Sequence, residues 1–260
     1  MLSQEQISQL LDAIYTGRIS VFDLPQVLYA HTRDALYTSL SAGWGALEES
    51  QILEQEKAHL FRQNINRFSG AKTWQEVNAL SEAVFDPEIG AKRSFSEFKK
   101  IALQIDETYN LTWLAVEQDT CVMQAMNARK WLKFEGEKEM FPFLRYQTVG
   151  DGKVRHSHAM LDGLTRRVDD PIWDSVMPQN GYGCRCIVTQ HEAGEYMPTT
   201  KIDGDDKTKP LFKEFKKNGA FNYNSGKVDF VFKENGNGKH EYFKVPREFR
   251  EDLKNNFGLE

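Results

Sequence analysis

The segment spanning residues 155–188 restricts the fold of this chain more than any other part of the sequence. It holds two histidines separated by one residue, an Asp162-Gly163 pair, prolines at positions 171 and 178, and a Cys-Arg-Cys triplet at 184–186. Glycine and proline interrupt regular elements, and these residues follow neither a helical period of about 3.6 nor the alternation of a strand. The segment therefore predicts a compact, loop-built element that packs into a core.

The first part of the chain is predicted to be helical. Ser3 and Gln6 have the spacing of a capping box, ahead of apolar residues at helical spacing that end at Gly17. A second helix is expected to start near Asp23, with Asp23 as its cap, and to extend to the Gly-Trp-Gly break at 43–45.

Three more helices are expected before the dense segment. One covers residues 47–68, and the next begins at a second capping box formed by Thr73 and Glu76. The longest helical stretch, over residues 95–131, contains no proline, although Asn110 marks a candidate break. Its apolar stripe is read as core packing.

Strand patterns follow Gly136. Residues 141–149 mix aromatic residues with Thr and Val and predict a strand. Gly150-Asp151-Gly152 is typical of a tight turn, and residues 186–189 are expected to form a short returning strand.

The tail is expected to be less regular at first. Residues 191–209 are rich in Gly, Thr, Asp and Lys and predict a linker or exposed loop. Strands at 228–232 and 242–245 are predicted to form a hairpin around an Asn-Gly-Asn-Gly loop, followed by an amphipathic helix over 246–257.

Together these patterns predict an α+β fold with a mainly helical first half, then a compact loop-rich region with short strands, and a C-terminal hairpin and helix. We expect three regions: a helical docking region at 1–90, a central domain at 91–195 and an extension at 196–260.

Charge and cysteine content limit the class of protein. The net charge of -5 and the pI of about 5.8 provide no overall basic field, so any contact with DNA must be local. The first residues have no signal-peptide pattern, and no run of about 18 apolar residues occurs, so we expect neither secretion nor membrane spanning. Three cysteines are an odd set for a disulfide-stapled domain and favour a reducing cytoplasm.

Metal binding is one interpretation of the dense segment. In an extended backbone, Cys184 and Cys186 point to the same side, and His156 or His158 could add a nitrogen and Asp162 a carboxylate to complete a structural zinc site. The alternative is two small buried cysteines beside hydrogen-bonded core histidines.

A cysteine nucleophile activated by Arg185 is also conceivable, but no third orienting group is evident. A zinc nucleobase deaminase is excluded, because the required His-x-Glu and Pro-Cys-x-x-Cys motifs are absent. Neither a Walker A loop nor a dinucleotide fingerprint is present.

Charged residues in the segment have two interpretations as well. Asp162, Asp169, Asp170 and Asp174 could supply a hydrolytic pair, but loop acids more often cap turns or face solvent. Arginines at positions 155, 166 and 167 could contact phosphate or an acidic partner, whereas solvated side chains are the simpler reading.

The order and spacing of these residues resemble the phage Mu F-like minor head protein family, whose shared domain is also called the phage head morphogenesis domain. The resemblance extends over roughly residues 95–190. The matching positions are Arg155, His158, Asp162, Gly163, Asp170, Trp173, Pro178, Asn180, Gly181, Gly183, Cys184, Arg185 and Cys186.

This resemblance implies a non-enzymatic minor capsid protein of a tailed phage or prophage. It implies action near the portal vertex, in the virion and, during assembly, in the host cytoplasm. The portal protein is the implied partner, with scaffold or major capsid protein and local DNA contacts as further candidates. Two alternatives stay open: a phage-delivered toxin or nuclease in the extension, and a metal-dependent hydrolase that uses the His/Cys cluster.

Overall fold

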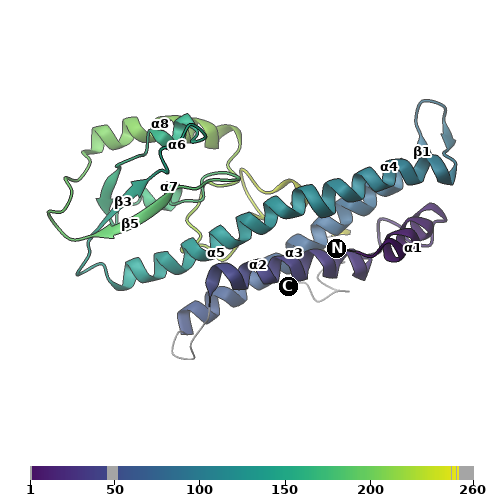
Figure 1. Cartoon of the computed structure of the whole chain (residues 1–260), viewed down its shortest axis with the longest axis horizontal. Coiled ribbons are helices and arrows are strands. Elements are labelled where there is room, and N and C mark those ends of the chain that lie inside the picture. The colour runs from purple at the N-terminus through teal and green to yellow at the C-terminus, as the bar shows by residue number, and fades with distance from the viewer. Residues whose placement is uncertain (1, 46–51, 247, 250, 252–260) are drawn as a thin grey trace. The chain divides into compact units, whose positions relative to one another are not determined.

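The computed structural model describes residues 2–45, 52–246, 248, 249 and 251. Helices dominate up to Gly136, and short strands follow, so the predicted α+β class is confirmed (Figure 1).

The first two helices begin differently from one another. Helix α1 (Gln4–Tyr15) has the predicted capping box, with Ser3 and Gln6 bonded to each other's backbone. Helix α2 (Gln26–Trp44) starts later than predicted, because the Asp23 carboxylate accepts hydrogen bonds from the backbone N–H and hydroxyl of Ser20. Asp23 therefore closes a turn and does not cap the helix.

Helix α3 (Ile52–Ala83) replaces two predicted helices. The second capping box was wrong, since Thr73 and Glu76 lie inside this helix and are buried. Burial of the residues around 64–73 keeps the chain helical where the local pattern predicted a new start.

A hairpin and a long interrupted helix come next. Strands β1 (Phe85–Asp86) and β2 (Ala91–Lys92) pair before α4 (Phe95–Glu107), whose predicted Ser94–Glu97 capping box is confirmed. The expected break at Asn110 takes the form of a π-helical turn, η1 (Thr108–Trp113), after which α5 (Leu114–Gly136) continues.

The central sheet has three antiparallel strands in the order β4-β3-β5. Strand β3 (Phe143–Gln147) is the middle strand and pairs with β4 (Thr165–Arg167) and with the predicted returning strand, β5 (Ile187–His191). Two one-turn helices, α6 (His156–Ala159) and α7 (Trp173–Val176), lie in the connections.

The predicted linker was wrong in its second half, where α8 (Lys201–Lys217) forms despite Pro210. The Thr200 hydroxyl accepts a hydrogen bond from the Asp203 N–H and caps the helix. Its buried residues recur at helical spacing: Gly204, Thr208, Leu211 and Phe215. Helix α8 lies beside α6, and the Lys207 ammonium donates to the carbonyl of Asp162 at 2.8 Å (Figure 1).

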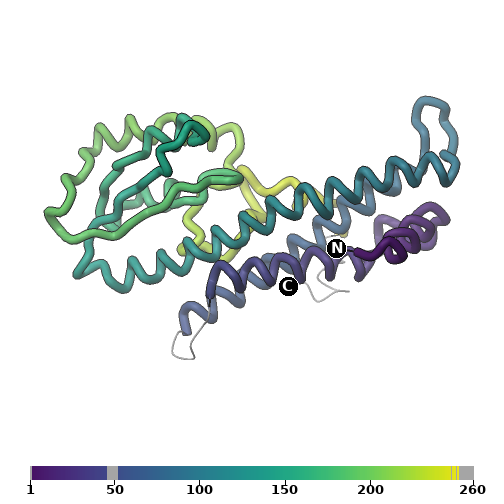
Figure 2. The backbone as a smooth tube through the Cα atoms, in the orientation of Figure 1, coloured from purple at the N-terminus to yellow at the C-terminus, as the bar shows by residue number. Residues whose placement is uncertain are grey.

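The predicted tail hairpin is also wrong. Residues 218–240 run as irregular loops, and a 3-10 turn over Glu241–Phe243 stands where the second strand was expected (Figure 2). Aromatic side chains take the place of a strand ladder: the Tyr223 hydroxyl, for example, donates to the Val231 carbonyl at 2.6 Å. The predicted last helix falls mostly outside the described residues.

The chain divides into two compact units, each made of several chain segments. Unit 1 comprises Met1–Ser39, Arg62–Gln118 and Glu241–Glu260, and unit 2 comprises Leu40–Phe61 and Asp119–His240. One apolar cluster in unit 1 joins α1, α2, α3 and α4. The core of unit 2 surrounds the sheet and includes Trp131, Tyr146 and Trp173.

Unit 1 also buries a polar cluster. The Lys72 ammonium lies 2.6 Å from the Glu117 carboxylate. The Asn110 amide of η1 donates to the Glu76 carboxylate of α3 at 2.7 Å and to the Asp106 carboxylate at 2.8 Å. Burial, together with the nearby Asp106 charge, raises the pKa of Glu76 to about 8.

None of the helices among the described residues is both long enough and apolar enough to cross a membrane.

Candidate functional site

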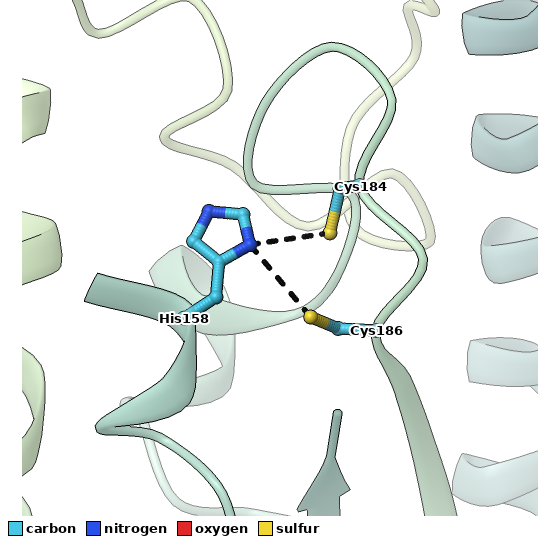
Figure 3. Close-up of side chains that lie close together, drawn as sticks. All are labelled: His158, Cys184 and Cys186. Atoms are coloured by element: carbon cyan, nitrogen blue, oxygen red, sulfur yellow. Dashed lines mark hydrogen bonds between the residues drawn. The ribbon is translucent and has the colours of Figure 1, made fainter. Parts of the chain in front are cut away.

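The dense segment forms much of the sheet region of unit 2 and brings three of its predicted side chains together. His158 lies on α6, and Cys184 and Cys186 precede β5. The Nδ1 atom of His158 is 3.5 Å from the Cys184 sulfur and 3.7 Å from the Cys186 sulfur (Figure 3). All three side chains are buried. Both thiols point to the same ring, as the alternation of side chains in an extended backbone predicts.

Local structure around the cluster explains how the three side chains are held. Gly183 has a φ of +66°, a left-handed conformation that favours glycine and turns the chain just before Cys184. Strand pairing of Val188 with Tyr146 fixes the backbone just after Cys186. The Arg155 guanidinium donates to the Tyr182 carbonyl at 2.6 Å and so links the start of α6 to this loop.

The two thiols differ in acidity. A hydrogen bond from Cys186 lowers the pKa of Cys184 to about 4, against the opposing effect of burial, and His158 adds to the lowering. Because its proton is shared with Cys184 and its side chain is buried, the pKa of Cys186 is raised above its usual value. The cluster therefore favours one thiolate beside one thiol.

A small cavity of about 20 Å³ adjoins the cluster. Its walls include all three side chains of the cluster, together with Val149 and Val154. A space of this size holds roughly one water molecule. It is too small for an organic substrate.

The structure separates His156 from this cluster. The His156 side chain is exposed and lines a different surface depression, beside Lys209 and Lys213 of α8. Asp162 is also elsewhere: its carboxylate accepts a hydrogen bond from the Thr148 N–H at 2.8 Å. Among the residues that the structure describes, the one metal-compatible group of His, Cys, Asp and Glu side chains is His158, Cys184 and Cys186.

Several other motif residues shape the backbone of the same unit. The Asp170 carboxylate accepts from the Ile172 N–H at 3.0 Å, and the Trp173 indole donates to the Arg167 carbonyl at 2.8 Å. The amide of Asn180 donates to the Val176 carbonyl at 3.0 Å and to the Tyr146 hydroxyl at 3.1 Å.

Glycine and proline positions of the motif complete this arrangement. Gly163 has a φ of +75°, and its N–H donates to the Tyr146 carbonyl at 2.9 Å. Pro178 is buried and Gly181 is half-buried in the loop that leads to Cys184.

The charged residues form pairs within the unit. Arg185 makes a bidentate pair with Asp151 at 2.7 and 2.8 Å. Its guanidinium is therefore bound to a carboxylate and is not positioned to activate a cysteine thiol. Arg166 pairs with Asp170 at 2.9 Å, and Arg167 pairs with Asp169 at 3.1 Å.

Sequence reasoning assigned no contact to two contributors to the site. Tyr146 is fully buried and receives the Asn180 amide, and Asp151 binds Arg185. The alternation of β3 could have indicated Tyr146, because Leu144 and Tyr146 share the buried face of that strand. No local signal identified the partner of Asp151, which lies 34 residues away.

Residues 91–189 match the family model described as "Phage Mu protein F like protein". This range begins at β2 and ends within β5, so it includes the whole His/Cys cluster.

Two relatives are similar over parts of their length. The "Mu-like prophage FluMu F protein" of Haemophilus influenzae is 49% identical over 47 residues, which are 18% of this chain and 11% of that protein. The "Putative capsid assembly protein F" of Escherichia phage Mu is 27% identical over 104 residues, which are 34% of this chain and 24% of that protein. The chain therefore spans a quarter or less of the length of these relatives. No solved structure matches it significantly.

The matched residues hold the motif from Arg155 to Cys186, on which the resemblance rested. The resemblance is therefore confirmed: over residues 91–189, this chain is similar to the Phage Mu protein F like family.

Proposed function

We propose that this protein is a minor head component of a tailed phage or prophage that acts in capsid assembly by protein recognition near the portal vertex. The observation that carries the proposal is the match of residues 91–189 to the Phage Mu protein F like family. The name of the phage Mu relative, which refers to capsid assembly, supports it.

The internal bonding of the motif supports a structural role without catalysis. Arg155, Asp170 and Asn180 all direct their polar groups to the backbone of their own unit. A side chain bound in this way fixes the shape of a surface and is not available to a substrate. The central domain at 91–195 thus acts as a stiff platform.

Residues 1–90 are proposed to dock onto the portal protein, with scaffold or major capsid protein as further partners. Several large apolar side chains of this region are exposed, among them Phe22, at 67%, and Ile89, at 73%. Exposed apolar side chains of this size are common anchors in protein interfaces. With a net charge of -5, contacts with DNA would be local.

Residues 196–260 are proposed to complete the fold instead of forming an effector domain. Leu211, Phe215 and Phe221 belong to the same core as Trp131 and supply part of its packing. If expression of the full chain arrested growth of a susceptible host, the effector alternative would regain support.

Co-purification with a tagged portal protein tests the docking. We expect Phe22→Asp combined with Ile89→Asp to reduce capture of the full chain at least about tenfold. Ile202→Asp is the matched control, because Ile202 is 75% exposed and lies outside residues 1–90. Equal capture of both variants and the unaltered chain would contradict docking through this region.

Mass spectrometry of purified particles tests the assignment as a whole. We expect the protein in virions or induced prophage particles, and in the host cytoplasm during assembly. Particles that contain portal protein but lack this chain would overturn its role as a component of the finished head.

A further inference from the structure

Three potential ligand atoms converge in the His/Cys cluster. The Nδ1 and sulfur atoms of His158, Cys184 and Cys186 all lie within 4.8 Å of one another. Zn–S bonds of about 2.3 Å and Zn–N bonds of about 2.0–2.1 Å at tetrahedral angles place a nitrogen and a sulfur ligand about 3.6 Å apart. The two N···S distances of 3.5 and 3.7 Å match this separation (Figure 3).

Hydrogen bonding alone does not satisfy all the polar atoms of the His/Cys cluster. Nδ1 of His158 offers either one proton or one lone pair, yet two sulfur atoms face it. The other ring nitrogen, Nε2, is buried and has no hydrogen-bond partner among the described residues. The ring is therefore oriented by its contacts on the sulfur side, and a single cation between the three atoms would use all of them.

The small cavity supplies the remaining coordination position. Its volume of about 20 Å³ accommodates one water molecule beside the three side chains. Three protein ligands with one water complete a tetrahedral zinc shell. Because nothing larger than water fits, this site would cross-link the chain and would not process a substrate.

We propose that His158, Cys184 and Cys186 bind one Zn²⁺ ion, with a water molecule as the fourth ligand, and that the ion fastens α6 to the start of β5. Nitrogen and thiolate ligands favour zinc over magnesium or calcium. Two bound thiolates balance the charge of the ion, and the proton of the remaining thiol passes to solvent on binding. This inference does not depend on the proposed role in capsid assembly.

Metal analysis of the purified full chain tests the site. With Zn²⁺ as the only added metal, we expect about one zinc ion per chain after dialysis. With Co²⁺ alone, we expect the intense visible bands of tetrahedral cobalt and a thiolate-to-cobalt charge-transfer band. A folded chain that retains no zinc and develops no cobalt bands would overturn the proposal. A Cys184–Cys186 disulfide in the folded chain, detected as the loss of two hydrogens, would do the same.

Matched variants assign the ligands. We expect His158→Ala, Cys184→Ser and Cys186→Ser each to weaken Zn²⁺ binding by at least about a hundredfold, because loss of supporting groups around a metal already costs up to that factor. His156→Ala is the closest control, since His156 is exposed and lies outside the cluster. Cys121→Ser controls for the loss of a buried thiol elsewhere. Equal weakening by both histidine variants would count against the assigned ligands.

The unaltered chain provides a second measurement in case the ligand variants do not fold. We expect its melting temperature to fall when zinc is removed by a chelator and to recover on addition of Zn²⁺ but not of Mg²⁺. An unchanged melting temperature throughout would overturn the fastening role.

Discussion

At the scale of single residues, Gly226 shows how closely the backbone of unit 2 approaches its core. A Cβ atom at this position would lie 2.2 Å from the Cβ of Trp131. Trp131 is buried, and the ammonium of Lys227 lies 4.8 Å from its ring centre. Since Cβ of Trp131 moves only with its helix, the contact leaves no room for a side chain.

We therefore expect Gly226→Ala to destabilise the protein by about 1–3 kcal/mol or more through overpacking. For a chain of this size, each kcal/mol lowers the melting temperature by roughly 2–4 °C. Gly152→Ala is the matched control, because nothing lies within 4 Å of a Cβ placed there. Thermal unfolding that does not distinguish the two variants would contradict this packing.

The candidate site was only partly predictable at this scale. The shared direction of Cys184 and Cys186 follows from their spacing, and the structure agrees. The residue pattern alone left the choice between His156 and His158 open, although the family resemblance named His158. Residues two apart on a helix point about 200° away from each other. Only one of them can face the core, and the position of α6 against β5 decides that it is His158.

At the scale of elements, the π-helical turn η1 changes the register of the long helix. Phe98 and Ala102 are buried before the turn, and Leu114, Glu117 and Cys121 after it. Ala102 and Leu114 are 12 residues apart, which in an unbroken α-helix would place them about 120° apart. Because a π turn contains about one additional residue, it returns Leu114 to the buried face.

This register predicts an unusual tolerance to deletion. Removing Glu107, which is exposed, should convert the π turn into regular α-helix and leave both buried faces aligned, with only a small loss of stability. Removing Asp119 from α5 should unfold or strongly destabilise the chain, because it rotates the following face by about 100°. Urea unfolding compares the two, and a Glu107 deletion as damaging as the Asp119 deletion would refute the account.

Elements with strong local signals were predicted well, and the others depended on distant contacts. The capping boxes at Ser3 and Ser94 are both present. The equivalent pattern at Thr73 failed because Glu76 is used by Asn110 of η1 and not by its own helix end. Helix α8 has few apolar residues and is held by Leu211 and Phe215 in the core, which its composition does not reveal.

The buried polar cluster between α3 and α4–α5 predicts a dependence on pH. The folded state raises the pKa of Glu76 from 4.5 to about 8, so it retains a proton that the unfolded state releases. Stability is then full below the unfolded pKa and falls as the pH rises through the interval up to about 8. Lys72 opposes the shift, and Asp106 and Glu117 reinforce it.

We expect the unfolding free energy of the unaltered chain to fall by on the order of 1–3 kcal/mol between about pH 5 and pH 8.5. Glu76→Gln keeps a hydrogen-bond acceptor for Asn110 but cannot titrate, so most of this decrease should disappear. Denaturant midpoints measured at both pH values provide the comparison. Parallel pH curves for the two proteins would rule out Glu76 as the source.

At the scale of the whole molecule, the chain alternates between its two compact units, and neither unit is a single stretch of sequence. Both sides of the β1–β2 turn contribute to both units: residues before Gly90 supply parts of each, and so do the residues after it. Local sequence patterns do not reveal this alternation, because it depends on which distant helices pack together. The predicted division at 90 and 195 therefore stays a prediction about sequence regions.

The exposed β1–β2 turn is a position at which the chain can be divided into two polypeptides. Gly90 is exposed, and nothing lies within 4 Å of a Cβ built there. Two polypeptides covering 1–90 and 91–260, expressed together, should assemble and elute as one species. Each compact unit contains residues from both polypeptides, so neither polypeptide can complete a unit alone. Separate elution of two folded polypeptides would contradict this. The intact protein would thus correspond to an obligate heterodimer of residues 1–90 and 91–260 whose two chains are joined by one peptide bond.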